Sequence, residues 1–150
     1  MFTVQEEVGL RGANAAALLI NPDFGIGLDT TIAYDTPGSA EKEQVSKLGS
    51  GPCVKIMDSQ TICDYRMVKY MKKISSLKNI KTQLEILPSG ATDTSPLQRM
   101  NSGGSIAGAI SVPTRHIHQT IETVNKTDLS NTIIFLYECL MELDQHDWAH

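Results

Sequence analysis

Strand-length apolar runs alternate with helix-length segments along this chain, and the alternation restricts its fold more than any other feature. The segments with strand character are residues 2–4, 25–33, 53–57, 82–87 and 106–112. The segments with helical character are residues 13–19, 62–77, 95–100 and 128–143, the last with Asp128 as an expected cap. Such alternation predicts an α/β sandwich built on a largely parallel sheet.

Composition narrows the class of protein. A chain of 150 residues with 41% hydrophobic residues suffices for one core, and no repeat or linker divides it. The net charge of −4 gives no basic field for nucleic acid, and no apolar run approaches the ~20 residues of a membrane span. With no secretory signal, we expect a cytoplasmic protein without nucleic-acid or membrane partners. Its three widely spaced cysteines predict buried, reduced thiols.

The adjacent carboxylates Glu6 and Glu7 are the first candidate site. Neighbouring side chains on an extended chain face opposite ways, so one carboxylate can hold a metal while the other reaches a water molecule on it. Hydrolytic metal sites need that division of labour. The alternative is a solvated acidic turn.

Two further candidates lie within or just past predicted strands, and the sites of α/β proteins collect at strand ends. Asp29 interrupts an apolar run, and a carboxylate buried there needs hydrogen-bond donors or a cation. It could therefore be a metal ligand, and the alternative is a structural Asp satisfied by hydrogen bonds. His116 and His118 share a face if their segment is extended, and surface histidines are the alternative there. Asp35, on the long loop at residues 34–51, is expected to be solvated.

The turn at residues 90–94 can aim Thr92 and Asp93 into a cleft, or can serve as a helix N-cap. Taken together, a Glu, an Asp and a His near strand ends form a nitrogen and oxygen ligand set. That set suits zinc, cobalt or manganese better than calcium. Sequence spacing alone does not show that these residues converge.

Several ordered blocks give the chain a family resemblance. They are Val4-Gln5-Glu6-Glu7-Val8-Gly9-Leu10-Arg11-Gly12-Ala13, Leu28-Asp29-Thr30-Thr31-Ile32-Ala33, Asp35-Thr36-Pro37-Gly38, Leu48-Gly49-Ser50-Gly51-Pro52, Ile56-Met57-Asp58 and Ser111-Val112-Pro113-Thr114-Arg115-His116-Ile117-His118. Across residues 2–143 the chain resembles the carboxy-terminal half of the M42 metallo-aminopeptidases, also called TET or glutamyl aminopeptidases. The resemblance implies a zinc-exopeptidase-like, three-layer α/β sandwich that is incomplete at its amino-terminal side. Residues 1–150 would then form the carboxy-terminal part of one catalytic domain, with no separate second domain.

The resemblance also implies roles for single residues. Glu6 matches the general base, Glu7 and His118 match ligands of one metal, and Asp29 matches a ligand of a second metal. Thr92 and Asp93 match residues near the bound substrate, whereas Ala91 departs from the usual glycine. His116 replaces a position that is usually aromatic, so it is not expected to be a ligand. The family binds two divalent metals, zinc or cobalt, and acts on the amino-terminal residues of peptides.

The family takes a further histidine and the bridging aspartate from segments upstream of the Glu-Glu pair. Three expectations therefore remain: an aminopeptidase-derived chain that is inactive alone and binds one metal or none, one half of a split enzyme completed by an amino-terminal chain, or a non-catalytic remnant that acts in binding or assembly. Family members form homo-oligomers, and exposed strand edges and apolar surface are expected here.

Overall fold

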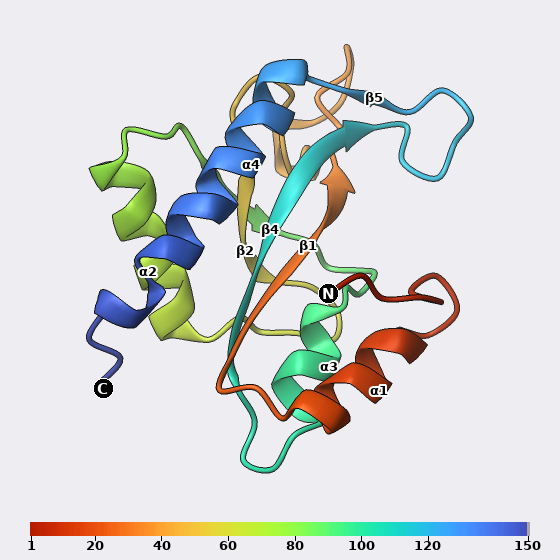
Figure 1. Cartoon of the computed structure of the whole chain (residues 1–150). Coiled ribbons are helices and arrows are strands. Elements are labelled where there is room, and N and C mark those ends of the chain that lie inside the picture. The colour runs from red at the N-terminus through yellow and green to blue at the C-terminus, as the bar shows by residue number, and fades with distance from the viewer. Residues whose placement is uncertain (150) are drawn as a thin grey trace.

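A mixed sheet with helices on both faces organises residues 1–149, which are the residues described by this computed structural model (Figure 1). Its strands are β1 (Phe24–Ile32), β2 (Cys53–Met57), β3 (Gln83–Ile86), β4 (Ile106–Arg115) and β5 (Thr123–Val124). The order is β1-β4-β2-β3, with β5 paired to the end of β4. The expected α/β sandwich is confirmed. The sheet is mixed: β1 and β4 are parallel, as are β2 and β3, whereas β4 runs antiparallel to β2 and β5. Apolar patterning reports burial and not strand direction, which is why the sequence missed this.

Helices cover the sheet unequally. They are α1 (Arg11–Ile20), α2 (Tyr65–Leu77), α3 (Thr94–Arg99) and α4 (Lys126–Met141), with short 3-10 helices at Glu41–Glu43 and Leu143–Gln145. α2 and α4 pack on one face, and α3 packs on β1 and β4 from the other, with α1 against α3. Glycine permits this close approach, because a Cβ at Gly27 would lie 2.1 Å from Thr94 Oγ1.

The hydrophobic core lies between the sheet and the α2/α4 layer. It comprises Val54, Met67, Tyr70, Met71, Ile74, Ile110, Phe135 and Cys139, none more than 3% exposed. The three-to-four spacing of the α2 members puts them on one helix face, as the sequence predicts. Each large apolar side chain buried there stabilises the fold by about 1.5–3 kcal/mol. The cysteines are buried free thiols, as expected.

The segment before α1 is not the expected strand. Gln5 is left-handed, with a φ of 59°, and the Val4 carbonyl accepts from the Gly12 amide at 2.9 Å. A Cβ at Gly12 would lie 2.5 Å from Val4 backbone atoms, so glycine allows the chain to fold back on the helix. Phe2 and Val4 remain exposed, and an isolated apolar run forms no strand without a neighbour to pair with.

Two other expectations at residues 34–51 and at α4 need correction. Asn125, and not Asp128, caps α4, because its side chain accepts from the amides of Thr127 and Asp128. The buried Asp128 carboxylate instead accepts from the Gly49 and Gly51 amides, at 2.6 and 2.9 Å. Asp35 is not solvated, since Arg115 donates to it at 2.6 Å. These bonds fasten both ends of the long loop.

No helix in the described part of the chain is both long and apolar enough to cross a membrane.

Candidate active site

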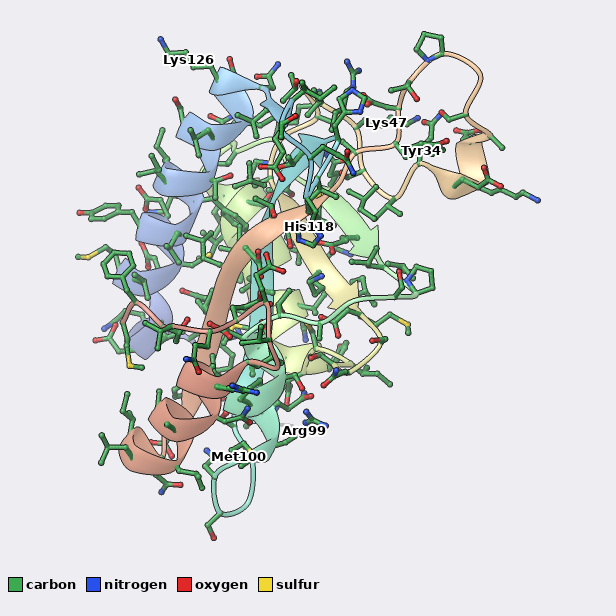
Figure 2. All side chains as sticks on the ribbon, turned by 90° about the vertical axis from the view of Figure 1, so that its right-hand side faces the viewer. Tyr34, Lys47, Arg99, Met100, His118 and Lys126 are labelled. Carbon is green, nitrogen blue, oxygen red and sulfur yellow. The ribbon has the colours of Figure 1, made fainter. Side chains whose placement is uncertain are left out.

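A cavity of about 260 Å³ opens where β1 and β4 end. Its lining consists of Glu6, Glu7, Asp29, Thr30, Thr31, Ile32, Leu87, Ser89, Ala91, Ile117 and His118. β1 and β4 are parallel, so their carboxyl ends meet at one edge of the sheet. Figure 2 shows His118 between the loop that carries Tyr34 and Lys47 and the end of α3 at Arg99. The structure therefore brings four sequence-predicted site residues into one cavity: Glu6, Glu7, Asp29 and His118.

Glu7 and His118 come together at this cavity. His118 Nε2 lies 3.2 Å from Glu7 Oε1, and both side chains are largely exposed, at 68% and 72%. The histidine segment is not extended, because His116 and His118 both have left-handed φ values, 57° and 62°. The two rings therefore do not share a strand face as expected. Only His118 lines the cavity, and a bond from its amide to Glu122 Oε1 at 2.5 Å holds its turn.

Glu6 and Asp29 lie deeper and share a negative environment. Burial raises the pKa of Glu6, and the nearby carboxylates of Asp29, Glu7 and Asp93 raise it further. Burial also raises the pKa of Asp29, against the lowering effects of the Thr30 amide and the Lys55 ammonium. Carboxylates gathered in this way repel one another, so a cation bound among them would relieve the repulsion.

Thr92 and Asp93 do not line the cavity. Thr92 is 4% exposed, and its hydroxyl lies 3.1 Å from Thr94 Oγ1 and 3.5 Å from Asp58 Oδ2. Asp93 accepts a hydrogen bond from Thr3 Oγ1, while its other carboxylate oxygen is buried without a partner. Asp93 thereby fastens the amino-terminal segment beside Glu6. Contact of these two residues with substrate stays a prediction.

Sequence reasoning missed a buried charged cluster behind the cavity. The Lys55 ammonium pairs with Glu85 and lies 3.8 Å from Asp58 Oδ2, and all three side chains are buried. Thr31 donates to the same Glu85 oxygen at 2.8 Å, which connects the cluster to the strand that carries Asp29. A lysine at the centre of an otherwise apolar five-residue strand was the available signal, because a buried lysine requires partners.

The donors present fit a divalent metal. Zinc binds nitrogen and oxygen at about 2.0–2.2 Å, so two ligands of one tetrahedral ion lie about 3.4 Å apart. The 3.2 Å between His118 Nε2 and Glu7 Oε1 is close to that separation. No group of three His, Cys, Asp or Glu side chains within residues 1–149 is arranged to hold an ion. A pair of this kind would account for two ligands of a four-ligand site.

Comparison with known proteins matches this chain to one family of peptidases. The sequence profile of the M42 glutamyl aminopeptidases matches residues 1–135. A relative from Acetivibrio thermocellus is 41% identical over 93% of this chain and 42% of its own length. A solved aminopeptidase of the archaeon Desulfurococcus kamchatkensis is 39% identical with a TM-score of 0.88, over 93% of this chain and 39% of that protein. A peptidase of Pyrococcus horikoshii, described as assembling into a tetrahedron or a large octahedral shell, is 29% identical with a TM-score of 0.78, over 91% and 38%.

These matches concern only part of each relative. The chain spans about two fifths of the length of the relatives it matches, and corresponds to their carboxy-terminal part.

Proposed function

The chain belongs to the M42 glutamyl aminopeptidase family, and from that premise we propose that it provides the general base and half of the metal ligands of a metal-dependent aminopeptidase site. The observation that carries the proposal is the convergence of Glu6, Glu7, Asp29 and His118 on one cavity. Its substrates are peptides with a free amino terminus, as the family description implies.

Glu7 and His118 would hold one divalent metal, zinc or cobalt, and Asp29 would contribute to a second. A divalent metal there supplies Lewis acidity, which polarises a peptide carbonyl and acidifies water. The histidine ring offers Nε2 to the site, and the exposed Glu7 carboxylate needs little rearrangement to share the ion with it. The negative surroundings of Glu6 and Asp29 favour cation binding over anion binding.

Glu6 is the proposed general base. Its half-buried carboxylate has a raised pKa, and a base is most effective when its pKa approaches the working pH. Glu6 takes a proton from the attacking water and delivers it to the leaving amine. The Glu6 backbone is well placed for this, because its carbonyl accepts from the Gly9 and Leu10 amides and fixes the turn before α1.

Two ligands do not complete a tetrahedral site, so the metal would need further donors beyond Glu7 and His118, as the family resemblance implies. The residues described here are therefore expected to be inactive alone. Self-assembly, as in the Pyrococcus horikoshii relative, is a further expectation for the completed protein.

The test is reconstitution. The part of the Desulfurococcus kamchatkensis aminopeptidase outside the matched region is co-expressed with this chain, and hydrolysis of aminoacyl-nitroanilides is measured with zinc or cobalt. We expect no turnover by this chain alone and measurable turnover by the pair. Glu6→Gln should abolish that turnover, and Glu43→Gln, on the exposed loop, should preserve it. A stable pair without turnover, or turnover that survives Glu6→Gln, would overturn the proposal.

A further inference from the structure

A cluster of rings forms where residues 146–149 return to the hydrophobic core. Trp148 lies 4.7 Å from Phe24 at the start of β1 and 5.0 Å from Tyr70 of α2, measured between ring centroids. His146 lies 4.9 Å from Tyr70 and meets Trp148 edge-on at 4.7 Å, with an interplanar angle of 86°. Tilted and edge-to-face rings at such separations attract one another. We call residues 146–149 the carboxy-terminal strap.

The two rings of the strap fasten it to the core. The Trp148 indole donates to the Leu143 carbonyl at 2.9 Å, and the Ala149 amide donates to Asp147 Oδ1 at 3.0 Å. Both bonds join residues that are close in sequence, so neither ties the strap to α2 or β1. Tyr70 contacts both strap rings and is only 1% exposed, so the strap helps to exclude water from the end of the core.

His146 is the ring of this cluster that can gain a charge near neutral pH, because histidine alone has an ordinary pKa in that range. Burial lowers the pKa of His146 below 6.5, the nearby ammonium groups of Lys73 and Lys69 lower it further, and Asp147 opposes them. Both lysines lie on the exposed side of α2, whereas Asp147 belongs to the strap itself. The neutral ring therefore fits this position, and a charged ring is disfavoured there.

The other polar groups around the cluster are accounted for. Burial raises the pKa of the Tyr70 hydroxyl, as do Cys139, Glu142 and Asp144, so this ring stays neutral when His146 titrates. The Glu142 carboxylate pairs with the Lys78 ammonium at 2.9 Å. Protonation of His146 is thus the change in charge that distinguishes mildly acid from neutral conditions in this cluster.

The strap is separate from the candidate active site. Its ring partner Phe24 begins β1, whereas the cavity lies at the opposite end of that strand. The M42 profile matches residues 1–135, so His146 and Trp148 also lie beyond the part of the chain that identifies the family. An inference about the strap therefore does not rest on the proposed function.

We propose that the carboxy-terminal strap is a pH-sensitive closure of the core, which covers Phe24 and Tyr70 at neutral pH and detaches at mildly acid pH when His146 takes up a proton. A released His146 has its ordinary pKa of about 6.5, whereas the docked ring has a lower one. The stabilising contribution of the neutral ring is complete above the released value and is lost as pH falls through the docked one. Uptake of one proton raises the ratio of released to docked strap by up to about tenfold per pH unit.

Fluorescence of Trp148, the single tryptophan of the chain, tests the proposal. Its emission maximum and its quenching by acrylamide are measured from about pH 8 to about pH 5, the range in which histidine titrates. Acrylamide quenching measures access to the ring, which a change in fluorescence yield alone does not. We expect a red shift and stronger quenching on acidification, while the far-UV circular dichroism of the chain stays constant.

Variants of His146 separate its charge from other effects of pH. His146→Gln cannot take up a proton, so the strap should stay docked throughout the range. His146→Arg carries a permanent charge and should release the strap already at neutral pH. His116→Gln and His116→Arg, at an exposed histidine, are the matched controls and should behave as the unaltered chain does. His150→Gln should likewise leave the release intact.

The lysines of α2 provide a second test. Lys73→Gln should reduce the release at acid pH, because a charged His146 is then less strongly repelled in the docked strap. Lys126→Gln, at the other end of α4 from the strap, should not change the release.

Three results would overturn the proposal. They are equal acrylamide quenching at both ends of the pH range, a red shift that persists in His146→Gln, and loss of circular dichroism in step with the red shift. The last result would mean that acid unfolds the whole chain and does not release the strap.

Discussion

The Lys55 ammonium lies 3.8 Å from the Asp58 carboxylate and also pairs with Glu85, and all three side chains are completely buried. Lys55 thus compensates two carboxylates in a region without water access. Removing one partner of a buried ion pair leaves an uncompensated charge, which is strongly destabilising.

Lys55→Met is therefore expected to lower the free energy of unfolding by about 3–5 kcal/mol in urea denaturation at neutral pH. Adding Glu85→Gln should recover part of that loss, since the orphaned charge is removed. Lys78→Met is the control, because Lys78 forms solvent-exposed pairs with Glu138 and Glu142, and should change stability little. Equal effects of Lys55→Met and Lys78→Met would contradict this account of the cluster.

Asp128 is expected to hold the long loop in place. Its buried carboxylate accepts from the Gly49 and Gly51 amides, so Asp128→Ala leaves two backbone donors without a partner. The loss should be about 1–3 kcal/mol for each buried unpaired group, measured by urea denaturation, with faster proteolysis at residues 34–51. Asp144→Ala, at an exposed aspartate, should leave both measurements unchanged.

The fold could be predicted from the sequence mainly where contacts are local. The apolar spacing of α2 predicts its buried face, although the helix begins at Tyr65, because Asp64 caps it, and not at residue 62. A lysine within an apolar strand indicates that Lys55 needs partners, but which residues pair with Lys55 and Asp128 could not be predicted, because those partners come from other elements of the fold. No periodicity reports such long-range pairs.

The candidate site was predicted by resemblance and not by spacing. The expected extended histidine segment is instead a left-handed turn, yet that turn brings His118 to Glu7. This turn is held by the bond from the His118 amide to the Glu122 carboxylate four residues further on, a side-chain contact that apolar spacing does not report. The prediction of a strand at residues 2–4 was wrong, because strand propensity has no effect without a neighbouring strand to pair with.

Asp29 and Asp35 should affect stability in opposite directions. The folded pKa of Asp29 is raised above 3.8 by burial, so the folded state loses stability as pH rises from the unfolded pKa through the folded one. The folded pKa of Asp35 is lowered, chiefly by the hydrogen bond from Arg115, so its contribution is present above the unfolded pKa and is lost as pH falls through the folded one. Asp29→Asn should therefore stabilise the chain at neutral pH, and Asp35→Asn should destabilise it.

Urea unfolding at a series of pH values from acid to neutral measures both effects. The Asp29→Asn gain should shrink on acidification, because the unaltered carboxyl is then neutral as well. A destabilising Asp29→Asn at neutral pH would mean that this carboxylate is structurally satisfied and not held under repulsion.

The single tryptophan reports on the carboxy-terminal end of the described chain. Trp148 packs on Phe24 and Tyr70, with ring centroids 4.7 and 5.0 Å apart, and closes the end of the core. Its fluorescence should be blue-shifted in the folded state and should shift red on unfolding. Trp148→Ala should cost about 2–3 kcal/mol of stability. Tyr137→Ala, at an exposed aromatic residue of α4, should cost far less in the unbound chain.

The central claim is that Glu7 and His118 together bind a divalent metal ion. Calorimetric titration with zinc or cobalt tests this claim most directly. The unaltered chain should bind about one metal ion, because one carboxylate and imidazole pair is in place. His118→Ala should abolish this binding. His116→Ala is the matched control, since that exposed histidine lies outside the cavity, and it should bind as the unaltered chain does. Binding that survives His118→Ala, or that is lost equally in His116→Ala, would contradict the assignment of this cavity as half of a metal site.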